Sequence, residues 1–207
     1  MRVLFMGSGD IGVPTLRWLL GSRHEVVGVV TQPDKPVGRH QEVAFSQIKG
    51  MALDAGVPVL QPEKVRTSEG LNAIAGLSPE VIVVVAYGQI LPKELLEMPA
   101  VACLNLHASQ LPRHRGASPI QAAIESGDET TAMAVMYMAE GLDTGDVLLQ
   151  REIRLKRRET GGSLHDRLAL LGPDALEEAL NLLDSGLAPR EAQDHLKATY
   201  AGKLHRE

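Results

Sequence analysis

Glu80-Val81-Ile82-Val83-Val84-Val85-Ala86 gives the strongest central-strand signal in the chain. Its five successive β-branched residues favour a strand, because branched side chains pack well on a pleated surface. The apolar run is continuous rather than alternating, which is typical of a strand that is covered on both faces. We therefore expect residues 80–86 to form a central strand of a parallel sheet.

Strand and helix patterns alternate on both sides of this stretch. The sequence predicts strands at residues 3–6 and 25–31, a helix at residues 13–20 between them, and a further strand at residues 101–106 that runs into His107. Other expected elements are a loop at 32–39, a helix at 44–55, a short strand at 57–60 and a short helix at 92–97. This alternation indicates an α/β fold with a doubly wound, mostly parallel sheet of the Rossmann-like type.

The pattern changes after residue 128. Residues 131–138 and 147–155 predict strands with little helix between them, so we expect antiparallel or edge additions to the sheet. A long helix is predicted from Ser163, which we expect to be its N-cap, to about residue 183, with Gly186 ending it. Pro173 lies inside this pattern and should kink the helix or divide it in two.

The composition restricts the class of protein. The chain has 207 residues, of which 44% are hydrophobic and 23% charged, so it is long enough to bury a core. A net charge of −5 argues against a nucleic-acid surface over the whole molecule but leaves room for a local basic patch. Cys103 is the one cysteine, which excludes an intrachain disulfide and a cysteine-based metal cluster. Neither a signal peptide nor an apolar run of ~20 residues is evident, and we expect a cytoplasmic protein.

Glycines at positions 7, 9 and 12 form a G-x-G-x-x-G motif between the first strand and the first helix. In this position the motif can bind a dinucleotide, because the tight turn brings a pyrophosphate to the helix N-terminus. Such a site also needs an acidic residue at the end of the second strand, and the nearest, Asp34, follows Pro33 in the loop. An NAD-dependent oxidoreductase is therefore an alternative that this motif supports only weakly, since any first βα turn favours glycine.

Polar residues at the end of the strand before His107 suggest chemistry. Asn105 and His107 lie two residues apart, so a strand directs both side chains to the same side. A carboxamide can donate a hydrogen bond to an oxyanion and an imidazole can move a proton, which suits acyl-group transfer. Asp143 lies in a glycine-rich acidic loop at residues 140–146, whose carboxylates could orient and charge the histidine or coordinate a cation. Each of these motifs alone is more often structural, as a hydrogen-bonded strand end or a simple turn.

Taken together and in this order, the motifs resemble the 10-formyltetrahydrofolate-dependent formyltransferases. The resemblance narrows to those members that act on methionyl initiator tRNA, and it runs from residue 1 to the end of the chain. Its motifs are Asn105-Leu106-His107-Ala108-Ser109, Leu111-Pro112, Arg115-Gly116, Gly141-Leu142-Asp143-Thr144-Gly145, Thr31-Gln32-Pro33-Asp34-Lys35-Pro36, Gly38-Arg39, Val83-Val84-Val85-Ala86-Tyr87-Gly88, Ile90-Leu91-Pro92 and Pro119-Ile120-Gln121.

The resemblance implies a mechanism and a set of site residues. Asn105 would hydrogen-bond the formyl oxygen, while His107, paired with Asp143, would stabilise the oxyanion and help to move a proton. The formyl donor, 10-formyltetrahydrofolate, would lie along two segments and against a loop glycine, contacting Tyr87, Gly88, Gln89, Ile90, Leu91, Ser109, Gln110, Leu111, Pro112 and Gly141. No metal is implied, and Cys103 is expected to be buried in its strand rather than to act as a nucleophile.

The resemblance also implies the partners and the domain organisation. Initiator methionyl-tRNA would be the acceptor, with Lys35 and Arg39 among its contacts, and the protein would be a monomer. Residues 1–190 would form the catalytic domain, and residues 191–207 would begin a linker to a C-terminal β-barrel domain that is absent from this chain. Two acceptors of the same chemistry remain open, an amino-sugar nucleotide and glycinamide ribonucleotide.

The chain departs from the pattern of the resembled family at two places. Gln110 and His114 replace the more apolar residues that are usual there, which implies a more polar rim for the folate pocket. The loop after Arg39 lacks the usual basic residues, which implies weaker phosphate contacts. A basic run follows at Arg151, Arg154, Lys156, Arg157 and Arg158, and it is interpreted as a solvated strand face, with a compensating RNA contact as the alternative.

Overall fold

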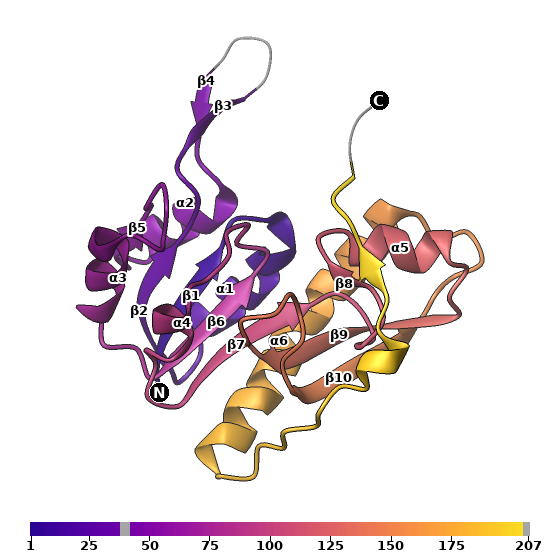
Figure 1. Cartoon of the computed structure of the whole chain (residues 1–207). Coiled ribbons are helices and arrows are strands. Elements are labelled where there is room, and N and C mark those ends of the chain that lie inside the picture. The colour runs from indigo at the N-terminus through magenta and orange to yellow at the C-terminus, as the bar shows by residue number, and fades with distance from the viewer. Residues whose placement is uncertain (38–41, 205–207) are drawn as a thin grey trace. The chain divides into compact units, whose positions relative to one another are not determined.

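The computed structural model of the chain describes residues 1–37 and 42–204. Its contacts divide the chain into two compact units, Met1–Cys103 and Leu104–Glu207. Each unit is described separately below, with the element labels of Figure 1.

The first unit is built on four parallel strands. They are β1 (Arg2–Gly7), β2 (Glu25–Val30), β5 (Val59–Leu60) and β6 (Val81–Val85), in the order β6-β1-β2-β5. Every side chain of β6 is at most 5% exposed, so the predicted central strand is confirmed. The residues of β1 from Val3 to Met6 are also fully buried, so both faces of this strand are covered. This explains why neither β1 nor β6 shows an alternating pattern.

Helices connect these strands. They are the 3-10 turn η1 (Asp10–Gly12) and the helices α1 (Val13–Leu20), α2 (Gln47–Asp54), α3 (Ser68–Ala75) and α4 (Lys93–Leu96). Helix α1 has the predicted bounds. Helix α3 was not predicted from its pattern, although Thr67 gives it an N-cap by accepting a hydrogen bond from the Gly70 amide.

A hairpin corrects two of the predictions. Strands β3 (Lys35–Val37) and β4 (Glu42–Ala44) pair antiparallel and extend away from the rest of the first unit (Figure 1). Part of the predicted loop at 32–39 is therefore a strand. The following helix begins at Gln47 rather than at residue 44, because the Ser46 hydroxyl caps it by accepting from the Lys49 amide.

The second unit is built on antiparallel strands. Strand β7 (Ala102–His107), whose first two residues still belong to the first unit, pairs with β9 (Thr130–Tyr137), and β9 pairs with β10 (Val147–Arg154). The predicted antiparallel additions are thus confirmed. Solved structures of related fold, described below, confirm the predicted mostly parallel α/β class.

The remaining elements of the second unit surround these strands. They are β8 (Arg115–Gly116), α5 (Pro119–Glu125), α6 (Gly161–Asp184), the 3-10 turn η2 (His195–Lys197) and β11 (Tyr200–Ala201), which pairs parallel with β8. Helix α6 packs on β9 and β10 with its apolar stripe, which includes Leu164, Leu168 and Leu176 (Figure 1).

Helix α6 has a different N-cap from the predicted one, and it is not divided at Pro173. Its N-cap is Thr160, and Ser163 is the third helical residue, whose hydroxyl accepts a hydrogen bond from the Thr160 amide. This arrangement is a capping box, so the serine has the reciprocal role to the one predicted. Pro173 does not divide the helix, which continues from Gly161 to Asp184. Gly186 follows the helix at φ +70°, as expected for a residue that ends one.

Residues after the predicted boundary at 190 contact the rest of the second unit. Glu191 forms an antiparallel bridge with Val147, and β11 pairs with β8. The segment from residue 191 to residue 201 is therefore hydrogen-bonded to the unit that precedes it. The boundary at residue 190 itself stays a prediction.

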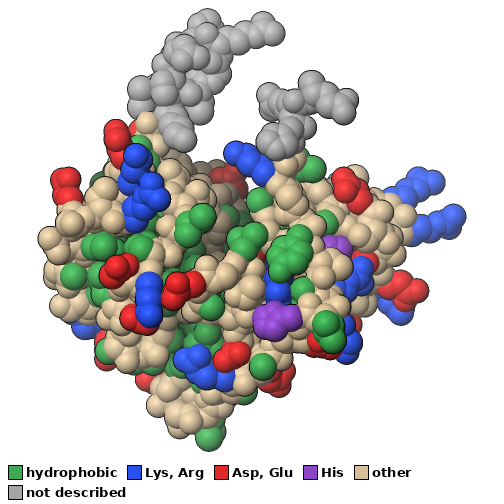
Figure 2. Space-filling model, viewed as in Figure 1, with side chains coloured by type: hydrophobic (Ala, Val, Ile, Leu, Met, Phe, Trp, Pro, Cys, Tyr) green, Lys and Arg blue, Asp and Glu red, His purple; other side chains and the backbone are tan. Residues whose placement is uncertain are grey.

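The surface carries both charges. Figure 2 shows acidic and basic side chains interspersed over the face in view, in keeping with the small net charge of −5. In the described part of the chain, no helix has the length and apolarity that crossing a bilayer requires.

Candidate functional site

Strand β7 positions Asn105 and His107. The two residues pair with Met136 and Ala134 of β9, so their positions alternate with the buried Leu104 and Leu106. The predicted placement on one side of the strand is confirmed by this register. His107 is 6% exposed, whereas Asn105 is half-buried and its carboxamide makes no hydrogen bond within the described residues.

The contacts of His107 define its tautomer. Its Nε2 lies 2.9 Å from the carbonyl oxygen of His114, and a carbonyl only accepts, so Nε2 carries the hydrogen. Its Nδ1 faces the Oδ2 atom of Asp143 at 3.7 Å. This distance is an ion-pair separation rather than a hydrogen bond, and Nδ1 is therefore the ring nitrogen that remains able to exchange a proton.

Asp143 is held in a constrained turn. Its backbone has φ +50°, a left-handed conformation that aspartate adopts more readily than most other residues with a side chain. The Gly116 amide donates to its Oδ2 at 2.7 Å, which fixes the carboxylate on the side of His107. The turn also needs Gly145, because a Cβ atom there would lie 1.8 Å from the Tyr137 carbonyl oxygen. The predicted association of His107 with Asp143 is thus present in the structure.

Sequence reasoning missed the groups that hold these two side chains. The His114 carbonyl binds the imidazole and the Gly116 amide binds the carboxylate, so one short segment orients both. Between them, the guanidinium of Arg115 is 1% exposed and donates to the Oε1 atom of Gln193 at 2.7 Å from Nη2 and 3.1 Å from Nε. Backbone groups leave no trace in a sequence pattern, and nothing in residues 191–201 marked Gln193.

The predicted folate contacts of the second unit lie close to this segment in sequence but are mostly engaged within the unit. Ser109 is fully buried and donates to the Arg113 carbonyl at 2.7 Å. The Gln110 carboxamide donates to Glu152 and accepts from Thr130. Three backbone carbonyls of this segment are engaged as well: that of Gln110 accepts from the Arg113 amide, that of Leu111 from the Gln150 carboxamide, and that of Pro112 from the Thr199 amide.

The other two side chains of that segment and the loop glycine behave differently. Leu111 is 5% exposed and packs with Ala134, Met136 and Val147 in an apolar cluster, so its side chain belongs to the core. Pro112 is half-buried and its carbonyl accepts from the Thr199 amide. Gly141 is exposed, next to the Asp143 turn.

The predicted folate contacts of the first unit follow β6. Tyr87 is 2% exposed, and its hydroxyl has no hydrogen-bond partner among residues 1–37 and 42–204. Burial raises its pKa to about 12, since the ionised phenolate would lose its hydration. Gly88 has φ +86°, a conformation that favours glycine. Leu91 is buried, whereas Ile90 is 87% exposed.

Gln89 has a structural role that the sequence did not reveal. Its Oε1 accepts from the Val65 amide at 2.8 Å, and its Nε2 donates to the Glu63 carbonyl at 3.1 Å. The side chain thus ties the loop after β6 to residues 63–65.

The predicted tRNA contacts fall largely outside the described part. Lys35 lies in β3, but its side chain is not among the described ones, and Arg39 lies outside the described residues. Asp34, the weak candidate for a ribose contact, is instead paired with Lys49 and accepts from Gln61 at 2.8 Å. The Lys49 hydrogen bond, followed by that of Gln61, holds the pKa of Asp34 below its usual value. This engagement argues against the oxidoreductase alternative.

The basic run after β10 begins with paired side chains. Arg151 lies 2.5 Å from Glu178, and Arg154 lies 4.0 Å from Glu129, with all four side chains substantially exposed. These pairs agree with the interpretation as a solvated strand face, and the RNA contact stays a hypothesis.

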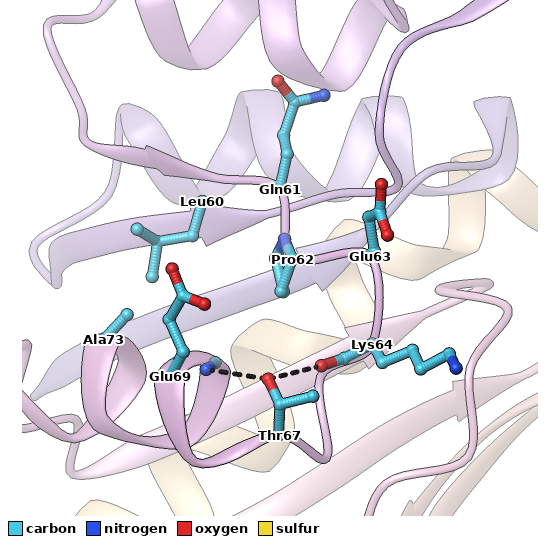
Figure 3. Close-up of a pocket in the computed structure, with 9 residues that line it drawn as sticks. Leu60, Gln61, Pro62, Glu63, Lys64, Thr67, Glu69 and Ala73 are labelled. Carbon is cyan, nitrogen blue, oxygen red and sulfur yellow. Dashed lines mark hydrogen bonds between the residues drawn. The ribbon is translucent and has the colours of Figure 1, made fainter.

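Cys103 and the cavities add little to the site. The Cys103 thiol is 6% exposed, and burial raises its pKa to about 12, which agrees with the prediction that it is no nucleophile. A cavity of about 570 Å³ opens in the first unit beside Leu60, Pro62 and Thr67, where Thr67 caps α3 (Figure 3). It contains none of the predicted site residues. Among the described residues, no group of three or more His, Cys, Asp or Glu side chains is arranged to hold a metal ion.

Comparison with solved structures supports the fold. The phosphoribosylglycinamide formyltransferase from Anaplasma phagocytophilum superposes with a TM-score of 0.78 at 17% identity and covers 99% of both chains. An N-formyltransferase from Helicobacter canadensis, solved with folinic acid and dTDP-3-aminofucose, gives a TM-score of 0.72 at 15% identity and covers 98% of this chain and 71% of its own.

Sequence comparison identifies the family. The methionyl-tRNA formyltransferase of Clostridioides difficile is 48% identical over 201 residues, which is 97% of this chain and 65% of the relative. The chain thus spans about two thirds of the length of such a relative. The sequence model of the formyl transferase family matches residues 1–180. This range includes β7, the Asp143 turn and both residues that flank Arg115. Since that match covers most of the chain, and the strand end and turn that it includes hold Asn105, His107 and Asp143, the chain belongs to the formyl transferase family.

Proposed function

We propose that this chain transfers a formyl group from 10-formyltetrahydrofolate to the amino group of methionyl initiator tRNA. The observation that carries the proposal is the arrangement around His107, whose Nδ1 faces Asp143 while its Nε2 is fixed by the His114 carbonyl. The relative at 48% identity, a methionyl-tRNA formyltransferase, supports the choice of acceptor. The folinic acid in the structure of the Helicobacter canadensis N-formyltransferase supports a folate donor.

The reaction sets two requirements for the protein. A bond forms between the amine nitrogen and the formyl carbon, and the bond from that carbon to the folate nitrogen breaks. The amine must lose a proton and the folate nitrogen must gain one, while the formyl oxygen carries negative charge in between. The site therefore needs a hydrogen-bond donor for the oxygen and a group that accepts and returns a proton.

Three residues meet these requirements. Asn105 is half-buried near the C-terminal end of β7, where pairing with β9 holds it in place, and its carboxamide donates to the oxyanion. His107 exchanges the proton through Nδ1, because its Nε2–H is held by a carbonyl. Asp143 stabilises the imidazolium that forms, since its carboxylate lies 3.7 Å from Nδ1, a gap that a small movement or a bridging water closes.

The folate contacts form the second part of the proposal. In the second unit, residues 109–112 and the exposed Gly141 would contact the donor. In the first unit, residues 87–91 would contribute, and the buried hydroxyl of Tyr87 would find a partner in the donor. Lys35 and Arg39 are proposed to contact the phosphates of the tRNA.

Variants of the catalytic residues test the assignment. His107→Ala and Asp143→Ala should each lower the rate of formyl transfer by at least about a hundredfold, because each removes a part of the proton-transfer device. Binding of folinic acid, measured by calorimetry, should change little. His165→Ala and Asp166→Ala remove the same side-chain types from α6 and serve as matched controls. Near-normal turnover in either test variant contradicts the catalytic roles.

A further inference from the structure

The segment of residues 191–201 lies beyond the part of the chain that matches the formyl transferase family, which ends at residue 180. It is nevertheless hydrogen-bonded at both ends to earlier residues of the second unit. Glu191 and Val147 exchange two backbone hydrogen bonds, of 2.8 and 3.0 Å. At the other end, the Arg115 amide donates to the Thr199 carbonyl at 2.9 Å. We call residues 191–201 the strap.

Gln193 lies in the middle of the strap and is 7% exposed. Its Nε2 donates to the carbonyl oxygens of Asp143 at 3.0 Å and Gly145 at 2.7 Å. Its Oε1 accepts from Arg115, from Nη2 at 2.7 Å and from Nε at 3.1 Å. Both donors and both lone pairs of the carboxamide are thereby used, and reversing the amide would set two like groups against each other at every contact.

The guanidinium of Arg115 depends on its hydrogen bonds to Gln193, because it is a charged group that is buried. It is fully buried, and its hydrogen bonds among the described residues go to Gln193, to the Tyr200 hydroxyl at 3.3 Å and to the His195 Nδ1 at 3.2 Å. All three acceptors belong to the strap. Because a buried charge needs its hydrogen bonds, the strap is held in register by Arg115.

The residues on either side of Arg115 hold the catalytic side chains. The His114 carbonyl accepts from the Nε2 of His107, and the Gly116 amide donates to the Oδ2 of Asp143. Gln193 therefore connects residues 114–116, which orient the side chains of His107 and Asp143, to the turn that carries Asp143. It touches neither reacting groups nor the imidazole, and it acts through the backbone of the Asp143 turn.

We propose that Gln193 is a positioning residue for the catalytic Asp143, with its carboxamide clamping the Asp143 turn to Arg115. The inference rests on the proposed function for its effect on turnover. Its geometric part, the placement of the Asp143 carboxylate, is independent of the acceptor and of the reaction.

The test substitution is Gln193→Glu in the 207-residue chain. A carboxylate still accepts from Arg115, and more strongly, so the strap stays in place and the fold is maintained. It cannot donate to the Asp143 and Gly145 carbonyls, and it repels them. Gln121→Glu makes the same change on α5 and controls for the added charge.

Two measurements give the expected result. In formyl transfer, kcat of the variant should fall about tenfold or more while KM for the folate donor changes less than about twofold, since the loss falls on alignment rather than binding. In native-state hydrogen exchange, the Gly116 amide should lose protection about tenfold, because its acceptor is the Asp143 carboxylate, while the amides of β9 keep theirs.

The outcomes separate the two proposals. An inactive parent chain contradicts the proposed function, and the exchange of the Gly116 amide then still tests the clamp. An active parent chain with unchanged kcat in the variant overturns the positioning role. Equal loss of protection at Gly116 and throughout β9 also overturns it, because that pattern indicates general destabilisation.

Discussion

At the scale of single residues, burial disfavours the charged forms of Tyr87 and Cys103. Their pKa values are raised to about 12 in each case, from ordinary values of 10.0 and 9.0. The cause is the same for both, since the charged form would lose its hydration. The consequences differ, because one group is a candidate for ligand contact and the other is not.

Tyr87→Phe should leave the free energy of unfolding unchanged or raise it by up to about 1 kcal/mol. The hydroxyl has no partner in the described part of the chain, so its removal loses no hydrogen bond and relieves a desolvation cost. The same variant should bind folinic acid more weakly, because the ligand would supply the missing partner. Urea unfolding and calorimetry check both parts. A loss of stability above about 1 kcal/mol would show that the hydroxyl is already hydrogen-bonded.

The Cys103 thiol should make stability fall at alkaline pH. Its pKa of about 12 in the folded state lies above the unfolded value of 9.0. Below pH 9 the thiol is protonated in both states, whereas between pH 9 and 12 only the unfolded state loses the proton. The free energy of unfolding then falls by about 1.4 kcal/mol per pH unit from this group. Cys103→Ala should show a slope that is shallower by this amount, measured by urea unfolding from pH 8.5 to 11. Equal slopes in the two proteins would contradict the buried thiol.

At the scale of elements, the Asp143 turn depends on the absence of a side chain at residue 145. Gly145→Ala places a methyl group where the Tyr137 carbonyl oxygen lies, so the turn has to move. We expect a loss of about 1–3 kcal/mol of stability together with a large loss of transfer activity. Gly162→Ala is the matched control, because its Cβ meets only the Thr160 hydroxyl oxygen at 4.0 Å and helix α6 should gain up to about 1 kcal/mol. Thermal unfolding of both variants measures the two changes in stability, and changes of the same sign would contradict the requirement for glycine at residue 145.

Elements also show which predictions a sequence supports. The run at Val81–Val85 and the helix at Val13–Leu20 were predicted well, because apolar periodicity and burial agree there. The N-cap of α6 was misplaced, since Thr160 and Ser163 are both capping residues and only the geometry assigns their roles. Pro173 was expected to kink or divide that helix; it does not divide it, and the packing of α6 on β9 and β10 outweighs the hydrogen bond that proline omits.

The candidate site was predictable to a similar extent. The spacing of Asn105 and His107 followed from strand geometry, and the association of His107 with Asp143 followed from the resemblance to a family. The His114 carbonyl, the Gly116 amide and Gln193 could not be predicted, because backbone contacts and long-range side-chain contacts leave no periodic signal.

At the scale of the whole molecule, the chemistry and the acceptor rest on different grounds. The family match covers residues 1–180 and supports formyl transfer in general. The choice of initiator tRNA rests on a relative of which this chain spans 65%. With a net charge of −5, the chain has to bind a polyanion through local basic residues, so we expect its tRNA affinity to fall steeply with salt.

The most direct measurement offers the chain three acceptors in parallel with 10-formyltetrahydrofolate: methionyl initiator tRNA, glycinamide ribonucleotide and an amino-sugar nucleotide. We expect formyl transfer to the methionyl-tRNA, with loss of that activity in His107→Ala. Transfer only to one of the other two acceptors, or transfer that survives His107→Ala, would contradict this expectation.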